Sequence, residues 1–200
     1  MPAPLLLINI LGAPAAGRHT TAAALLYALK RARVPTELVA DWPPSVAERL
    51  DGTQRTLAQR RNRLTATELK LSQLAARGTT VVIMDEPLFD PYLMSGDHGG
   101  MLTGEEARLL TDTLAAHRAR PQLTYLISRA APALPVLGAV EAVKLQALHA
   151  LTATITEQMR QSLGELGIAY AEVVDPQDPA QGVLARVRQD LAQRAIHLAP

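Results

Sequence analysis

Short apolar segments alternate along this chain with longer segments in which apolar residues recur at helical spacing. The apolar segments are Leu5–Leu11, Thr36–Asp41, Thr80–Met84, Leu123–Ile127 and Ile168–Val174. The helical segments are Arg18–Arg33, Thr56–Arg77, Thr103–His117, Val140–Leu166 and Pro179–Ala195. Strands that alternate with helices form parallel sheets with helices on both faces. The alternation therefore predicts an α/β fold with three layers and a five-stranded parallel sheet.

The composition fits one domain and disfavours several classes of function. A hydrophobic fraction of 48% over 200 residues is enough for one full core, so we expect residues 1–200 to form a single domain. The chain has no cysteine, which excludes disulfides, thiolate metal sites and a cysteine nucleophile. Its net charge of +1 and its 3% of aromatic residues give little support to nucleic-acid binding.

The first apolar run is interpreted as a buried strand rather than a signal peptide, because it lacks a preceding basic segment. No apolar stretch reaches the roughly 18 to 20 residues that a membrane-spanning helix needs. We therefore expect a cytoplasmic protein that does not engage a membrane. The oligomeric state is left open, and a homo-oligomer is compatible with the sequence.

A glycine-spaced turn connects the first strand to the first helix. Gly12 and Gly17 can take positive φ angles and let the backbone approach a ligand closely. Backbone amides at a helix N-terminus favour an anion. The residues expected to cradle phosphates are Gly12, Ala13, Pro14, Ala15, Ala16, Gly17, Arg18, His19, Thr20 and Thr21. The alternative is an ordinary strand–turn–helix whose glycines only make the turn.

Two side chains in this turn depart from the standard phosphate-binding pattern, which has Lys followed by Ser or Thr. Arg18 keeps the positive charge but is larger and forked, and it could point along the loop or out to solvent. His19 is a poor ligand for magnesium, which prefers oxygen. Thr20 and Thr21 supply hydroxyls one and two positions later, so Thr20 is the candidate metal ligand.

Acidic residues follow the second and third strands. Asp85 and Glu86 end the third strand, where an acid can hold magnesium directly or through water. Asp41 ends the second strand and could orient an acceptor hydroxyl. The alternatives are that Asp85 caps the following turn and that Asp41 starts the Trp42-Pro43-Pro44 turn. Ligands bind at the carboxyl ends of strands in open α/β sheets, so one cleft could hold these acids, the loop and Arg129.

With these residues placed, the chain resembles phage and bacterial P-loop kinase-like ATPases of the nucleoside and nucleotide kinase group. The resemblance rests on GAPAAGRHTTAA (12–23), ELVADW (37–42), VVIMDEPL (81–88), LTYLISR (123–129) and LGELGIAYAEV (163–173). It implies a P-loop NTPase fold with a short lid at 130–139. It also implies transfer of the terminal phosphoryl of ATP to a nucleoside, a nucleotide or a modified base.

By this resemblance, ATP and magnesium are the expected cofactors and a small-molecule nucleotide is the expected partner. Residues 12–20 would cradle phosphates, Asp41 would face the acceptor, Asp85 would serve the metal and Arg129 would lie at the lid. Arg18 completes the expected catalytic set. DNA is an acceptor that the resemblance allows, although the charge does not indicate it.

The departures leave two hypotheses open. Arg18, His19 and a lid without Lys or Arg weaken the expected catalytic machinery, since lid cations stabilise the transferring phosphoryl group. The first hypothesis is an active, atypical ATP-dependent phosphotransferase. The alternative is a catalytically impaired pseudokinase that binds a nucleotide, an anion or a protein partner.

Overall fold

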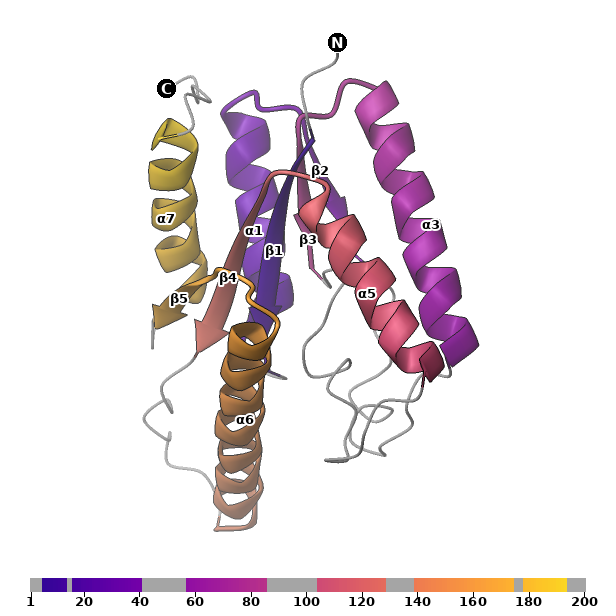
Figure 1. Ribbon diagram of the computed structural model, residues 1–200. Helices are drawn as coiled ribbons and strands as arrows, with labels where there is room; N and C mark the ends of the chain where they lie inside the picture. The colour runs from indigo at the N-terminus through magenta and orange to yellow at the C-terminus, as the bar shows by residue number, and fades with distance from the viewer. Residues whose placement is uncertain are drawn as a thin grey trace.

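The computed structural model describes residues 5–13, 16–40, 57–85, 104–128, 139–174 and 178–193, with side chains from 61 in the third range and from 150 in the fifth. Strands and helices alternate through these ranges (Figure 1). They are β1 (Leu6–Gly12), α1 (Arg18–Arg31), β2 (Thr36–Val39), α3 (Leu57–Ala76), β3 (Val81–Met84), α5 (Gly104–Arg118), β4 (Gln122–Ser128), α6 (Ala139–Glu165), β5 (Ala171–Val174) and α7 (Pro179–Gln193). None of the helices in these ranges is long and apolar enough to cross a membrane.

The strands form one five-stranded sheet in the order β2-β3-β1-β4-β5, and every neighbouring pair is parallel. The strand β1 lies at the centre, and all of its residues are buried. It pairs with β3 through Asn9 and Met84 and with β4 through Gly12 and Ile127. The carboxyl ends of β1, β3 and β4 therefore lie side by side at the same end of the sheet.

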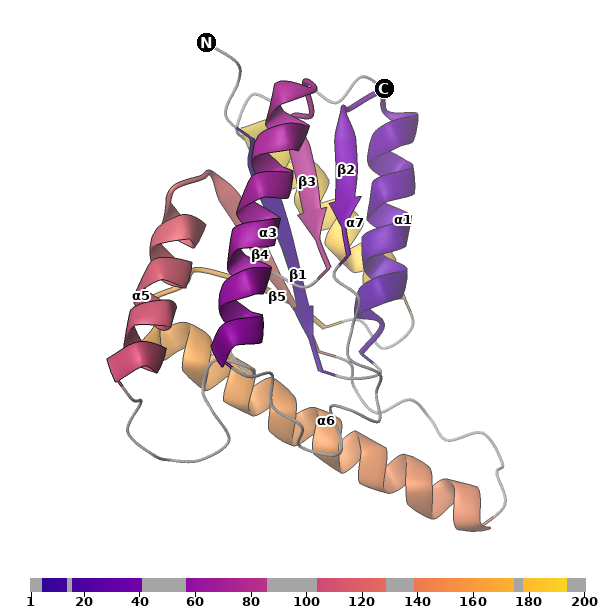
Figure 2. The same ribbon diagram turned by 90° about the vertical axis from the view of Figure 1, so that its right-hand side faces the viewer.

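Helices cover both faces of the sheet (Figures 1 and 2). On one face, Leu25 of α1 and Val187 of α7 pack with Ile8 and Ile10 of β1. On the other face, α3 packs over β1 and β3, and α6 packs over β4. The predicted three-layer α/β architecture is confirmed.

The predicted element bounds differ from the observed ones by up to three residues within the described ranges. The largest difference is at β5, which begins at Ala171 rather than Ile168. This strand lies at the edge of the sheet, and its residues alternate between partly buried and exposed. Ile168 instead lies in the segment between α6 and β5, where its amide donates to the carbonyl of Leu163 and its side chain packs against α6.

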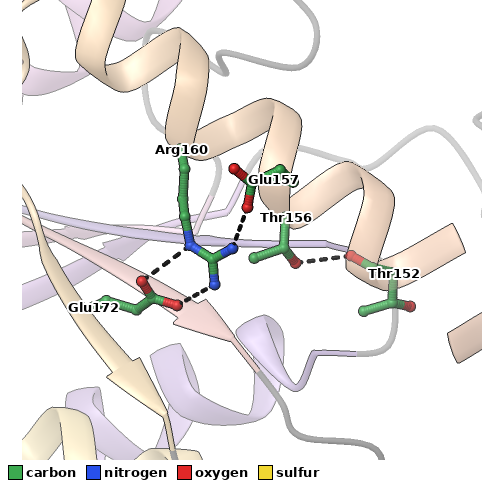
Figure 3. A network of polar contacts seen from close by, with 5 residues as sticks. All are labelled: Thr152, Thr156, Glu157, Arg160 and Glu172. Atoms are coloured by element: carbon green, nitrogen blue, oxygen red, sulfur yellow. Dashed lines mark hydrogen bonds and ion pairs between the residues drawn. The ribbon is translucent and has the colours of Figure 1, made fainter. Parts of the chain in front are cut away.

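A polar network fastens α6 to the edge strand β5 (Figure 3). The guanidinium of Arg160 donates to both carboxylate oxygens of Glu172, at 3.1 and 2.5 Å, and to Glu157 at 2.5 Å. One turn earlier, the hydroxyl of Thr156 donates to the carbonyl of Thr152 at 2.8 Å. The hydrogen bonds from Arg160 hold the pKa of Glu172 below its usual range.

Replacement of Arg160 by Met is expected to lower the free energy of unfolding by about 1 kcal/mol. The pair is bidentate but partly exposed, and exposed ion pairs contribute about 0–1 kcal/mol. Because the pKa of Glu172 is lowered, the contribution is present above the ordinary glutamate pKa and is lost as the pH falls below it. Urea unfolding at neutral and acidic pH tests this. Arg188→Met, at an exposed position of α7, is the control, and an equal loss in both variants would contradict the assignment.

Candidate functional site at the start of helix α1

The turn between β1 and α1 is shaped by two glycines in different ways. Gly17 is the N-cap residue of α1 and has a left-handed backbone, with φ 89° and ψ 17°. Gly12 does not have a positive φ, because it is paired with Ile127 inside the parallel ladder. A Cβ at Gly12 would lie 3.3 Å from the Cβ of Ala16 and 3.4 Å from the carbonyl oxygen of Ile127. The expectation of positive φ is thus met at Gly17 only, and Gly12 serves close packing.

The first turn of α1 presents backbone amides that no side chain caps. Gly17 offers no side-chain hydrogen bond, and the first turn contains no acidic residue. Its carbonyl accepts the first helical hydrogen bond, from the amide of Thr21 at 2.9 Å. Uncapped amides and the positive end of the helix dipole favour an anion at this position.

Asp85 lies next to this helix start because β3 is the neighbour of β1. It directly follows β3, its residue is 4% exposed, and its amide donates to the carbonyl of Val39 at 3.2 Å. The carbonyl of Val39 belongs to β2, so the backbone of Asp85 continues the ladder between β2 and β3. The acid predicted at the carboxyl end of the third strand is therefore fixed in place by the sheet.

Arg18 and His19 both turn to the Asp85 carboxylate. The Nε of Arg18 lies 3.2 Å from Oδ1 of Asp85, and both side chains are only 5% exposed. The Nδ1 of His19 pairs with Oδ2, while the imidazole remains 58% exposed. We call Arg18, His19 and Asp85 the carboxylate cluster. The sequence had left Arg18 to point along the loop or to solvent, and its buried position on Asp85 shows that the second option is wrong.

The carboxylate cluster is a poor fit for magnesium. A basic side chain lies against each oxygen of Asp85: Oδ1 is ion-paired with Arg18 without accepting a hydrogen bond, and Oδ2 pairs with His19. Unit charges about 4 Å apart interact by about 4 kcal/mol near a protein surface, so repulsion between Arg18 and a divalent cation would offset much of the attraction from Asp85. Among the described residues, no group of three or more His, Asp and Glu side chains is placed to hold a metal.

The other predicted site residues are partly described. Ala13 and Ala16 are buried, and the amide of Ala16 donates to the carbonyl of Ala13 at 3.1 Å. Thr20, the candidate metal ligand, is exposed on α1, whereas Thr21 is buried. The predicted residues that lie outside the described ranges are Pro14, Ala15, Asp41, Glu86, Arg129 and positions 130–138 of the lid, whose last residue, Ala139, begins α6. Their assigned roles remain predictions.

The sequence placed each member of the cluster in the cleft but missed the contacts among them. His19 and Asp85 are 66 residues apart in the chain. The sequence did contain a signal for these contacts: Arg18 and His19 are both basic, and the acid Asp85 is retained at the end of the third strand. Opposite charges that lie together at the carboxyl ends of the strands are expected to pair, because burial of an unpaired charge is costly.

Comparisons with known proteins agree with the fold. No family model matches the chain, and no curated protein matches it. Solved structures are similar to the chain, among them the following two. The thymidylate kinase from Ehrlichia chaffeensis is 15% identical, with 94% of this chain and 100% of that chain covered and a TM-score of 0.53. The structure titled APE1195 is 13% identical over 98% of this chain and 99% of that chain, with a TM-score of 0.46. The chain therefore has an α/β fold similar to that of the thymidylate kinase.

Proposed function

We propose that this chain is a nucleotide-binding protein on a kinase-like fold in which phosphoryl transfer is impaired. The observation that carries the proposal is the pairing of Asp85 with Arg18 and His19. In a working phosphotransferase of this class, the loop cation reaches the terminal phosphates and the strand-end acid serves the metal. In this chain, the two groups engage each other instead.

Binding of a phosphate group is supported by the backbone rather than by the altered side chains. The left-handed Gly17 and the uncapped amides at the start of α1 form a place where an anion is favoured. Arg18, the first residue of α1, is a buried cation neutralised by Asp85. The ligand would therefore be held by amides and the helix dipole, which argues for weak binding.

The first test is calorimetry with ATP on the wild type and on Gly17→Ala. A side chain at φ 89° costs about 1–2 kcal/mol, so the turn is expected to rearrange and to weaken ATP binding by about tenfold or more. The matched control is Gly78→Ala, because Gly78 has φ 82° and follows α3, where its Cβ would meet nothing within 4 Å. Both variants are expected to lose similar stability, and only Gly17→Ala is expected to lose binding.

The second test separates this proposal from an active phosphotransferase. We expect no acceptor-stimulated ATP turnover with nucleosides, nucleotides or DNA, in the presence of magnesium or manganese. Turnover that an acceptor stimulates would instead support the active enzyme, with Asp41 at the acceptor and Arg129 at the lid. Equal ATP binding by the wild type and Gly17→Ala would show that ATP does not bind at this loop.

A further inference from the structure

We propose that this site takes its phosphate ligand without a divalent cation, because Arg18 and His19 occupy the carboxylate that would hold one. This inference rests on the proposed function, since it names the form of the ligand that the same site binds. The ligand class is a metal-free nucleotide or a related phosphate anion.

The position of each group in the carboxylate cluster is set by the fold rather than by a flexible surface. Asp85 is held at the end of β3 by its backbone hydrogen bond to Val39. Arg18 is the first residue of α1, and its side chain is as buried as that of Asp85, at 5% exposure. A metal ion at Asp85 would therefore have to displace a buried guanidinium and not a mobile surface group.

Charge balance points to the same conclusion. The pair of Arg18 and Asp85 adds no net charge at the start of α1. If a divalent cation took the carboxylate, the guanidinium would lose its counter-charge inside the protein, and burial of an unpaired charge is strongly disfavoured. A phosphate anion at the helix amides makes no such demand, because it leaves the ion pair intact.

The chemistry of the altered loop positions supports exclusion of the metal from both sides of the carboxylate. Arginine has donors only and cannot ligate a cation. Imidazole is a poor ligand for magnesium, which prefers oxygen. In addition, Nδ1 of His19 is paired with Oδ2 of Asp85. Of the two threonines that follow, Thr20 is exposed and Thr21 is buried.

The test combines calorimetry of ATP, with and without magnesium, and electron paramagnetic resonance of manganese. We expect the ATP affinity to stay within about threefold when magnesium is added, and no manganese to bind at Asp85 in the free protein or with ATP. An affinity that rises about tenfold or more with magnesium would overturn the inference. So would a manganese signal that Asp85→Asn abolishes and that Asp112→Asn, at an exposed position of α5, preserves.

The test also covers two other outcomes, a variant that does not fold and a protein that does not bind ATP. If Asp85→Asn does not fold, the double variant Arg18→Met with Asp85→Asn removes the carboxylate without leaving a buried charge, and the same manganese comparison is made with it. If ATP fails to bind under either condition, the proposed function is wrong and the inference falls with it. If ATP binds, manganese titration decides the inference: a manganese site that depends on Asp85 overturns it, and the absence of such a site, with an ATP affinity that magnesium does not change, upholds it.

Discussion

Replacement of Asp85 by Asn is expected to lower the free energy of unfolding by about 3–5 kcal/mol, the usual cost of removing one partner from a buried ion pair. Arg18 and Asp85 are each 5% exposed. The variant would leave the Arg18 guanidinium buried without its carboxylate, which is far costlier than the loss of an exposed pair at about 0–1 kcal/mol. Urea unfolding at pH 7, or a fall in the melting temperature, measures the effect.

A double-mutant cycle distinguishes the ion pair from other effects at these positions. Arg18→Met is expected to destabilise the protein as well, and the double variant Arg18→Met with Asp85→Asn is expected to recover much of the loss, because both charges are gone. His19→Ala is expected to cost less than about 1 kcal/mol, because the imidazole is largely exposed. Additive single losses, with no recovery in the double variant, would contradict a coupled pair.

The fold could be predicted from the sequence because local patterns determine most of it. Parallel strands buried on both faces require apolar runs such as Leu5–Leu11, and the helices between them follow from apolar spacing. The central place of β1 matches its complete burial. The bounds were least accurate at β5, because an edge strand is exposed on alternate residues and its apolar signal merges with that of the preceding turn.

The site was predicted only in outline, because its chemistry depends on contacts between distant residues. The sequence identified Arg18 and Asp85 as charged groups of one cleft and assigned them to different partners, phosphate and metal. Whether a buried arginine turns to a ligand or to a carboxylate is decided by the distance between α1 and the end of β3, and that distance comes from the pairing of β1 with β3. A pattern of residue types along the chain does not contain that distance.

The protein is expected to lose stability on mild acidification because of His117. This residue is 3% exposed in the last turn of α5, and burial, with a smaller effect of Arg118, lowers its pKa from 6.5 to about 4. A helix C-terminus favours a protonated histidine by typically 0.3–1 kcal/mol. The lowering of the His117 pKa from 6.5 to about 4 corresponds to about 3 kcal/mol in favour of the neutral ring. Burial therefore outweighs the helix dipole, and the folded state keeps the ring neutral.

The direction of the pH dependence follows from the two pKa values. Between about pH 6.5 and pH 4 the unfolded chain binds a proton at His117 that the folded chain does not bind. The part of the stability that depends on a neutral His117 is thus present above pH 6.5. About 2 kcal/mol of the free energy of unfolding is expected to be lost between pH 7.5 and pH 5. Urea unfolding across this window measures the loss, and His117→Gln, which cannot titrate, is expected to show a curve flatter by that amount. Parallel curves for the wild type and His117→Gln would assign the acid sensitivity to other groups, and a loss confined to values below pH 4.5 would point to carboxylates such as Glu172.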